Sequence, residues 1–258
     1  MALQPYERYA EIYDRIGQRQ FGQRLADAIM ADPAIGMSDG ARIADLACGT
    51  GAAALRFAAA GFDVTGVDRS GQMLDRAKQS ALAEGVRVEW LLQDLRDLVL
   101  SHPVDFATCV YDSLNYVLRE QELARIFERV AQSLRPGGKF IFDLNSKRRL
   151  SEGWADETFV AADEPDLFVV YRSTWDEESS CSPLQLTAFL RRDDGHTWER
   201  FDEDHVERGY LITEIETLLR AAGFTSIDIR EFHARTGDLT SQGTERSNRL
   251  VFIASLEP

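Results

Sequence analysis

A short apolar run that ends in a glycine-containing turn carries the first residues whose types and spacing suit chemistry. It reads IADLACGTGAAAL over residues 43–55, and Asp68 follows at the end of the next apolar run. Glycines at a strand-to-helix turn allow the backbone to approach a ligand closely, and an aspartate at that distance can bind the hydroxyl groups of a ribose. Gly49, Gly51 and Ala54 match the pattern G-x-G-x-x-A. The stretch therefore predicts a site for a nucleotide-like cofactor, without deciding which one.

Asp45 distinguishes between such cofactors. It precedes Gly49 by four residues, near the end of the expected strand, where a dinucleotide fingerprint usually passes from strand straight into glycine. A carboxylate at this point repels a pyrophosphate but attracts a ligand that carries an ammonium group. S-adenosylmethionine combines adenosine with an amino acid and has no phosphate. Asp45 therefore favours this cofactor over NAD, and an NAD-dependent oxidoreductase remains an alternative.

Polar and aromatic side chains follow the fourth expected strand. The stretch CVYDSLNYV delivers Tyr111, Asp112, Asn115 and Tyr116 to one edge of the sheet. Ligands of open α/β sheets bind beyond the carboxyl ends of the strands, so we expect this loop to face a methyl or hydride acceptor. Tyr111 and Asp112 are candidate catalytic residues, and Asn115 and Tyr116 are candidate substrate contacts. Apolar packing is the competing explanation for either tyrosine taken alone.

The N-terminus and a later segment supply further candidates. Tyr9 and Tyr13 lie four residues apart on one face of an expected helix, and we take Tyr13 as a candidate catalytic residue and Tyr9 as a candidate substrate contact; an amphipathic core helix is the competing explanation. His205 is the candidate base or proton acceptor near neutral pH, and a strand histidine that faces solvent is the competing explanation. Further candidate substrate contacts are Tyr171, Arg208 and Tyr210.

The elements that must position these side chains alternate along the first 145 residues. Near-continuous apolar runs separated by helical patterns are typical of parallel strands joined by right-handed crossovers, so we expect an α/β fold with a doubly wound sheet. The expected strands lie at 42–47, 62–68, 86–92, 105–111 and 139–145, and the expected helices at 5–16, 20–31, 52–60, 71–83 and 120–134.

The pattern changes between residues 151 and 208 to period-two alternation, with the turn DDG at 193–195, which predicts a small antiparallel insert. A helix at 213–222 and strands at 226–232 and 249–255 then resume the sheet. We therefore divide the chain into N-terminal helices over 1–35, a cofactor-binding core over 36–150 and 209–258, and an antiparallel insert over 151–208; the resemblance described below implies that the first part is a lid and that the insert covers the substrate.

Composition excludes several classes of function. The formal net charge is −14, and the insert holds 16 acidic residues, five arginines and no lysine. Such a surface repels nucleic acid and suits a cationic or amine-bearing acceptor, and the one basic cluster, SKRRL at 146–150, is best explained as a solvated patch. No run suits a membrane span or a signal peptide, so we expect a cytoplasmic protein. Three widely spaced cysteines predict neither disulfides nor a metal site, and the oligomeric state, a homo-oligomer included, stays open.

Four motifs in this order resemble those of the class I, Rossmann-like S-adenosylmethionine-dependent methyltransferases. They are DLACGTG at 45–51, GVDRS with Asp68, LLQDLRDL with Asp94, and LRPGGKFIFDLN at 134–145. The resemblance implies a seven-stranded sheet of order 3-2-1-4-5-7-6 with an antiparallel seventh strand, to which RLVFIAS corresponds. The N-terminal YERYAEIYDRI and the insert resemble the lid and the substrate-covering sheet of small-molecule N-methyltransferases.

The resemblance also implies a set of cofactor contacts. The turn from Ala47 to Gly51 would support the methionine part, Asp68 the ribose, Met73 a face of the adenine, and Asp94 with Leu95 its edge; Ala47 replaces a glycine that many members have. The full set of expected cofactor-binding residues is Tyr13, Asp45, Ala47, Cys48, Gly49, Thr50, Gly51, Asp68, Arg69, Met73, Asp94, Leu95 and Tyr111.

Together these features predict methyl transfer from S-adenosylmethionine to a small-molecule acceptor, which leaves S-adenosylhomocysteine. In-line displacement at a sulfonium is accelerated by positioning and by exclusion of water, and an amine needs only to arrive neutral, so N-methylation is favoured. The alternatives are an O-methyltransferase with a histidine or aspartate base, an NAD-dependent oxidoreductase, and a non-catalytic regulator that binds the cofactor.

Overall fold

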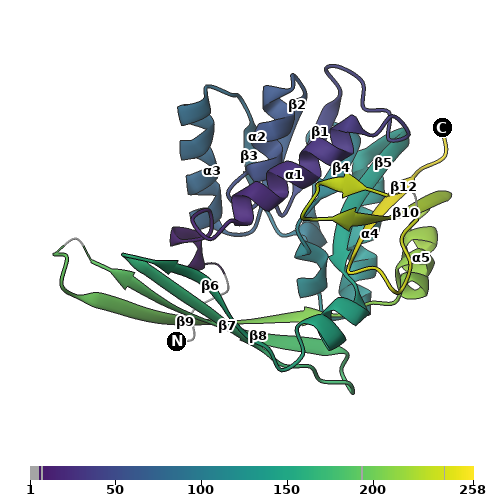
Figure 1. Cartoon of the computed structure of the whole chain (residues 1–258). Coiled ribbons are helices and arrows are strands. Elements are labelled where there is room, and N and C mark those ends of the chain that lie inside the picture. Colours follow the sequence, from purple (N-terminus) through teal and green to yellow (C-terminus); the bar gives the residue numbers. More distant parts are fainter. Residues whose placement is uncertain (1–5, 7, 193, 241) are drawn as a thin grey trace.

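The computed structural model describes residue 6 and residues 8–192, 194–240 and 242–258, which form two sheets with helices around the larger one (Figure 1). The larger sheet has eight strands in the order β11-β10-β12-β5-β4-β1-β2-β3. Their bounds are β1 Arg42–Leu46, β2 Asp63–Asp68, β3 Glu89–Leu92, β4 Val104–Cys109, β5 Leu134–Asn145, β10 Ser226–His233, β11 Asp238–Leu239 and β12 Arg249–Ser255.

The strand order confirms the predicted topology. Strands β1 to β5 pair in parallel, and β12 is antiparallel to both of its neighbours, β5 and β10. The sheet has one strand more than the seven expected, because β11 adds a pairing of two residues at the edge of β10. A strand of two residues is too short to leave an alternating pattern in the sequence.

Two apolar clusters cover the two faces of the large sheet. The helices are α1 Gln18–Ala31, α2 Ala52–Ala59, α3 Gly71–Glu84, α4 Glu120–Ser133 and α5 Ile212–Ala221. Side chains of α4 and α5 pack with one face of the sheet, and those of α1 and α2 pack with the other. The central strand β4 is buried along its whole length, which explains its continuous apolar run. Within the described ranges, no helix has both the length and the hydropathy that a membrane span requires.

The four-stranded insert confirms the predicted small antiparallel sheet. It consists of β6 Thr158–Glu164, β7 Leu167–Ser173, β8 Cys181–Arg191 and β9 Trp198–Arg208, which pair in sequence order. The insert lies beyond one end of the core, and the described residues that precede α1 lie between it and the ends of α1 and α3 (Figure 1). Of the turn expected at 193–195, Asp193 lies outside the described residues, and Gly195 takes a positive φ of 70°.

The helix expected at 5–16 is wrong. Among the described residues, this segment forms one 3-10 turn over Tyr9–Glu11, followed by further turns. Gly17, which has a φ of 90°, directly precedes α1. Its apolar side chains are buried against the insert rather than along one helical stripe, because Tyr9 and Ile12 pack with β7, β8 and β9. We call residue 6 and residues 8–17 the N-terminal segment.

Candidate active site

A first cavity opens at the carboxyl ends of the parallel strands, where the sequence predicts the cofactor. Nine of the thirteen expected cofactor-binding residues line it: Tyr13, Ala47, Gly49, Asp68, Arg69, Met73, Asp94, Leu95 and Tyr111. They come from the N-terminal segment and from the loops that follow β1, β2, β3 and β4. The fold therefore brings together residues that lie far apart in the sequence at one edge of the sheet.

The two glycines of the turn after β1 have different surroundings. Both have positive φ values, 55° at Gly49 and 82° at Gly51. A Cβ added at Gly49 would meet no atom within 4 Å, so this backbone is open to the cavity. A Cβ at Gly51 would lie 2.8 Å from the side chain of Trp90, so packing against the sheet requires this glycine.

Asp68 links the turns after β1 and β2. Its Oδ2 accepts a hydrogen bond of 2.8 Å from the N–H of Gly49, and its Oδ1 accepts one of 2.8 Å from the N–H of Ser70. Burial raises the pKa of this carboxyl, although the two backbone N–H groups oppose the shift. Each oxygen keeps a lone pair, which is the arrangement that two ribose hydroxyl groups require.

Asp45 lies below the same turn and does not line the cavity. It is fully buried, and its Oδ1 accepts a hydrogen bond of 2.8 Å from Thr108 Oγ1. Its Oδ2 is buried with no hydrogen-bond partner among the described residues. Burial raises the pKa of Asp45 to about 7, against the effect of the Thr108 hydroxyl. A cationic group bound at the turn would compensate this unpartnered oxygen, so the residues present fit the amino-acid part of the predicted cofactor.

The remaining four expected cofactor contacts do not line the first cavity. Cys48, Thr50 and Gly51, like Asp45, are outside the lining of the first cavity. Thr50 Oγ1 donates a hydrogen bond of 2.7 Å to Asp14 Oδ1, which ties the turn to the N-terminal segment. In the lining itself, Asp94 is paired with Arg96, and this ion pair lowers the pKa of Asp94.

A second cavity, of about 380 Å³, adjoins the first one. It lies between the N-terminal segment, the insert and the loop after β4, and six tyrosines line it: Tyr6, Tyr9, Tyr13, Tyr111, Tyr116 and Tyr171. Four of these, Tyr6, Tyr13, Tyr111 and Tyr116, also line the first cavity, so the two spaces share a wall. Burial raises the pKa of every one of the six phenols, which keeps them neutral at physiological pH.

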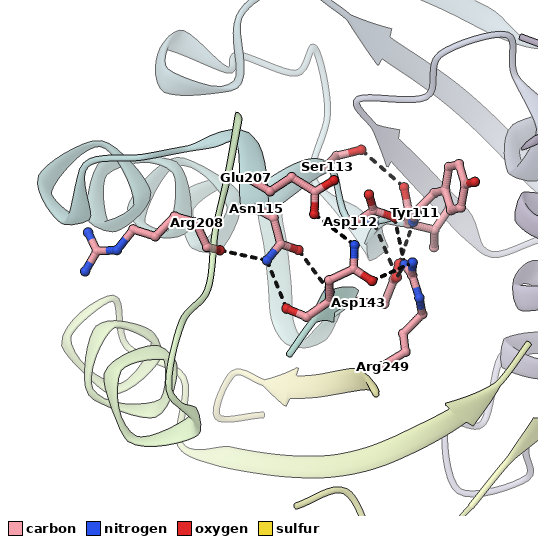
Figure 2. A network of polar contacts seen from close by, with 10 residues as sticks. Tyr111, Asp112, Ser113, Asn115, Asp143, Glu207, Arg208 and Arg249 are labelled. Carbon is pink, nitrogen blue, oxygen red and sulfur yellow. Dashed lines mark hydrogen bonds and ion pairs between the residues drawn. The ribbon is translucent and has the colours of Figure 1, made fainter. Parts of the chain in front are cut away.

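An ion-pair network holds the loop after β4 beside this cavity (Figure 2). The Arg249 guanidinium at the start of β12 binds Asp112 at 2.8 Å and also pairs with Asp143. Asp143 in turn accepts hydrogen bonds from the backbone N–H groups of Tyr111 and Asp112. Both of these residues have positive φ values, 70° and 49°. The network therefore stabilises a backbone conformation that is strained for side chains with a Cβ, at the wall between the cavities.

Glu207 belongs to the same network and lines the second cavity. Its Oε2 accepts a hydrogen bond of 2.8 Å from Asn145 Nδ2, while Asn145 Oδ1 accepts one of 2.9 Å from Arg249. Its carboxyl group lies beside that of Asp112 (Figure 2). Burial, and next to it the charge of Asp112, raise the pKa of Glu207 well above its usual range. Asp112 and Asp143 thus share one guanidinium, and the carboxyl group of Glu207 adjoins them through Asn145.

His205 precedes Glu207 on the same inward face of β9. Its ring is 3% exposed, and neither ring nitrogen has a hydrogen-bond partner among the described residues. Its Nε2 lies 3.6 Å from Glu203 Oε2, and its ring centroid lies 5.3 Å from that of Tyr6. His205 lines the second cavity, so the histidine that faces solvent is excluded, whereas its role as a base stays a prediction.

Three expected substrate contacts lie outside both cavities. The Asn115 amide donates to the carbonyl oxygens of Asn145 and Arg208, and the Tyr210 hydroxyl donates to the Val117 carbonyl. The Arg208 guanidinium lies over the Tyr210 ring and binds the Leu118 carbonyl. These three side chains donate hydrogen bonds to backbone carbonyl oxygens, so they stabilise the loop after β4 and its surroundings instead of facing a ligand.

Sequence reasoning missed several residues of the second cavity. They are Tyr6, Arg149, Trp154, Glu207 and Arg249. Tyr6 continues the spacing of Tyr9 and Tyr13, and Glu207 follows His205 at period two, so both had a local signal. Arg249 had none, because it reaches Asp112 across 137 positions of the chain.

Comparisons with known proteins identify the family of the chain. A family model described as a methyltransferase domain matches residues 43–138. The chain is 36% identical over 222 residues to a protein of Geobacillus sp. (strain WCH70) that carries a methyltransferase name, with 83% of each chain covered. It is 30% identical over 251 residues to a similarly named protein, YqeM, of Bacillus subtilis (strain 168), with 96% of each covered.

A crystal structure of an S-adenosylmethionine-dependent methyltransferase from Clostridium acetobutylicum superposes on the chain with a TM-score of 0.82. The two are 25% identical, and the match covers 99% of this chain and all of the other. The sugar N-methyltransferase KedS8 from Streptoalloteichus sp. shares the fold with a TM-score of 0.72 at 20% identity, over 100% of this chain and 99% of that one.

Two more distant relatives are named for different acceptors. One is a dTDP-4-amino-2,3,4,6-tetradeoxy-D-glucose N,N-dimethyltransferase of Saccharopolyspora spinosa, 28% identical over 137 residues, which cover 52% of this chain and 53% of that one. The other is a ubiquinone biosynthesis O-methyltransferase of Xylella fastidiosa, 29% identical over 154 residues, which cover 59% of each.

Proposed function

Because this chain belongs to the class I S-adenosylmethionine-dependent methyltransferases, we propose that it methylates an amine nitrogen of a small-molecule acceptor. The observation that carries the proposal is the second cavity, whose lining includes six tyrosines and the carboxylate residues Asp112 and Glu207. Aromatic ring faces and carboxylates both attract a protonated amine. The named N-methyltransferases among the similar proteins support the same choice.

The residues of the first cavity suit the methyl donor. Asp68 would bind the ribose hydroxyl groups, Met73 and Leu95 would contact the adenine, and the turn at Ala47 and Gly49 would bind the amino-acid part. Bound there, S-adenosylmethionine supplies an electrophilic methyl group on a sulfonium. Tyr13 and Tyr111, which line both cavities, would exclude water from the point of transfer.

The carboxyl groups of the second cavity suit the other half of the reaction. Glu207 would accept a proton from the ammonium group of the acceptor, and the freed nitrogen lone pair would form the new N–C bond as the C–S bond breaks with its electrons retained by sulfur. A carboxylate whose pKa is raised is a better match for this proton transfer than an ordinary one.

A labelling experiment tests the proposal directly. The purified protein is incubated with methyl-labelled S-adenosylmethionine and a panel of amines, amino acids and amino sugars, each paired with the compound in which a hydroxyl group replaces the amine. We expect label in the amines and S-adenosylhomocysteine in equal amount. Label confined to the hydroxyl compounds, or no label although the donor binds, would contradict N-methylation.

Donor affinity is expected to depend on pH through Asp45. The pKa of this carboxyl is raised to about 7, so it is neutral in mild acid and attracts the donor ammonium group only as the pH rises through 7. The ionised fraction of a carboxyl with this pKa rises from about one tenth at pH 6 to about nine tenths at pH 8, so donor binding should be up to about tenfold weaker at pH 6 than at pH 8. Calorimetry at both pH values measures this ratio.

The control for Asp45 is 5′-methylthioadenosine, which has the adenosine part but no ammonium group. If Asp45 causes the effect, the affinity of 5′-methylthioadenosine should be nearly the same at pH 6 and pH 8, while that of the donor changes. An equal pH dependence for the two ligands would therefore assign the effect to Asp68 or to the loops, and not to Asp45.

A further inference from the structure

The three basic residues at 147–149, which the sequence suggests form a solvated patch, have different surroundings. Lys147 pairs with Glu177 at 3.3 Å, and the exposed Arg148 pairs with Glu152 at 2.9 Å. Arg149 instead turns inward and lines the second cavity. No carboxylate pairs with its guanidinium anywhere in the part of the chain that the structure describes. In a protein with 43 acidic residues against 29 basic ones, a half-buried arginine without such a partner needs an explanation.

The surroundings hold the Arg149 side chain in one place. Its guanidinium lies over the Trp154 ring at 5.2 Å from the centroid. The chain also passes closely at Gly153, where an added Cβ would lie 2.9 Å from Arg149 Nη1. When an arginine stacks on an aromatic ring, its N–H groups point along the plane of the guanidinium and stay free for hydrogen bonds. The stacking also restricts the rotamers of the side chain before a ligand binds.

The other arginine of this cavity is not available for a ligand. Arg249 binds Asp112, Asp143 and Asn145, so its charge and its donors are used within the protein. The second cavity therefore presents two distinct polar features: the carboxyl groups of Asp112 and Glu207, and the guanidinium of Arg149, which has no carboxylate partner among the described residues.

We propose that the acceptor carries an anionic group, a carboxylate or a phosphate, and that Arg149 binds it while the amine lies at Asp112 and Glu207. This inference rests on the proposed function for the position of the amine, but not for the anion subsite. A planar guanidinium with paired N–H groups matches the geometry of carboxylate and phosphate oxygens, and the partial burial of Arg149 strengthens the interaction relative to a fully exposed side chain. The substrate class is thus an amino acid or a phosphorylated amine rather than a simple alkylamine.

Matched acceptors and matched variants test the anion subsite. The acceptors are glycine against glycinamide, 4-aminobutyrate against butylamine, and glucosamine 6-phosphate against glucosamine. The variants are Arg149→Gln and Arg149→Lys, with Arg148→Gln as the control, because Arg148 is exposed on the same turn. Initial rates are measured with the donor saturating, and binding is measured by calorimetry with S-adenosylhomocysteine present, so that a readout exists for acceptors that do not turn over.

For the wild-type protein we expect the anionic member of a pair to bind at least tenfold more tightly than its neutral counterpart. Arg149→Gln should remove this preference through an increase in KM, with the neutral acceptors changed less than twofold, and Arg149→Lys should keep part of it. The carboxylate and phosphate pairs then show which anion is preferred. Arg148→Gln should leave all values unchanged.

Two other results would overturn the inference. Equal weakening of neutral and anionic acceptors in Arg149→Gln would mean that the side chain only supports the cavity wall. An absence of any anion preference in the wild-type protein would exclude the subsite. Failure of the proposed function would give a different result. If anionic hydroxyl compounds were preferred and no amine were methylated, N-methylation would be rejected, while the assignment of Arg149 to the anion subsite would stand.

Discussion

Replacing Glu207 with glutamine is expected to lower methyl transfer to an amine about 100-fold at pH 7, which is the usual contribution of a positioned general base. Glutamine has the same shape, and its carbonyl oxygen can still accept the hydrogen bond that Asn145 Nδ2 donates at 2.8 Å. The variant therefore keeps the packing and the link to Arg249 while it removes the group that takes the proton.

The pH dependence separates this role from a structural one. At neutral pH the acceptor arrives as an ammonium ion and needs a proton acceptor, whereas above the pKa of the amine it arrives neutral and does not. The defect of Glu207→Gln should therefore shrink to less than about tenfold near pH 10, since the base then contributes little. In the wild-type enzyme the rate should fall in acid, because the raised pKa of Glu207 leaves the carboxyl already protonated there.

A carboxylate on the opposite face of the same strand provides the control for Glu207. Asp204 is exposed and its nearest polar contact is Gln185 at 3.5 Å, so Asp204→Asn should change neither the rate nor its pH profile. A Glu207→Gln defect of equal size at every pH would show that the side chain supports the cavity without accepting a proton. His205→Gln, measured in the same series, then tests the remaining candidate.

The residue of β9 that stands out in the sequence differs from the residue that we propose as the proton acceptor. His205 stands out by residue type, because its unperturbed pKa lies near neutrality. Glu207 does not stand out, since an acidic residue in an acidic strand is ordinary until burial raises its pKa. Burial along β9 alternates from Glu203 through His205 to Glu207, yet only the tertiary pairing shows which face covers the cavity.

Local pattern was sufficient for the core and insufficient for the acceptor side. Buried parallel strands and glycine turns are encoded over a few residues, which is why the strands and the positions of Asp45 and Asp68 at their ends follow from the sequence. The order of the strands has no such local signal, and it was implied by the resemblance to the family. The second cavity is assembled from the N-terminal segment, the insert and β12, and contacts such as that between Arg249 and Asp112 leave no trace in spacing. For the same reason, the cofactor and acceptor roles of individual residues stay predictions.

The N-terminal segment shows how a correct feature led to a wrong element. Tyr9 and Tyr13 are four residues apart, as on one face of a helix, but both are oriented by the insert and by neighbouring rings, with their centroids 5.1 Å apart. Three of the backbone N–H groups in this segment are bound by a side chain from β9 instead of by helical carbonyls. A side chain from a distant strand can thus replace a local hydrogen-bond pattern.

That side chain is Glu203, and its replacement by glutamine is expected to weaken binding of both donor and acceptor by about 30-fold. Its Oε1 accepts hydrogen bonds of 2.7 Å from the N–H groups of Arg8 and Tyr9, and its Oε2 accepts one of 2.8 Å from Tyr6. Glutamine would keep one oxygen and turn an amide N–H toward a backbone donor. Loss of a charge-assisted hydrogen bond and an unsatisfied buried donor cost about 2 kcal/mol, which corresponds to this factor.

The effect should appear in ligand affinity rather than in global stability. The N-terminal segment covers both cavities through Tyr6 and Tyr13, so a looser segment exposes both ligands to water. Burial would raise the pKa of Glu203, but the nearby imidazole and the three backbone N–H groups outweigh it and lower the pKa. The carboxylate is therefore ionised at neutral pH, and its contribution is lost only as the pH falls through this lowered pKa.

Calorimetry measures the expected loss of donor affinity, and hydrogen exchange at the amides of Arg8 and Tyr9 measures the expected loosening of the N-terminal segment. Exchange at these amides should accelerate in Glu203→Gln while amides of the central strand β4 keep their protection. Glu199→Gln is the matched control, because it removes an ion pair of 2.7 Å to Arg8 at the rim of the same strand and should cost less than about 1 kcal/mol. If both variants weaken donor binding equally, the segment is held by its net charge, and the specific hydrogen bonds to Glu203 do not matter.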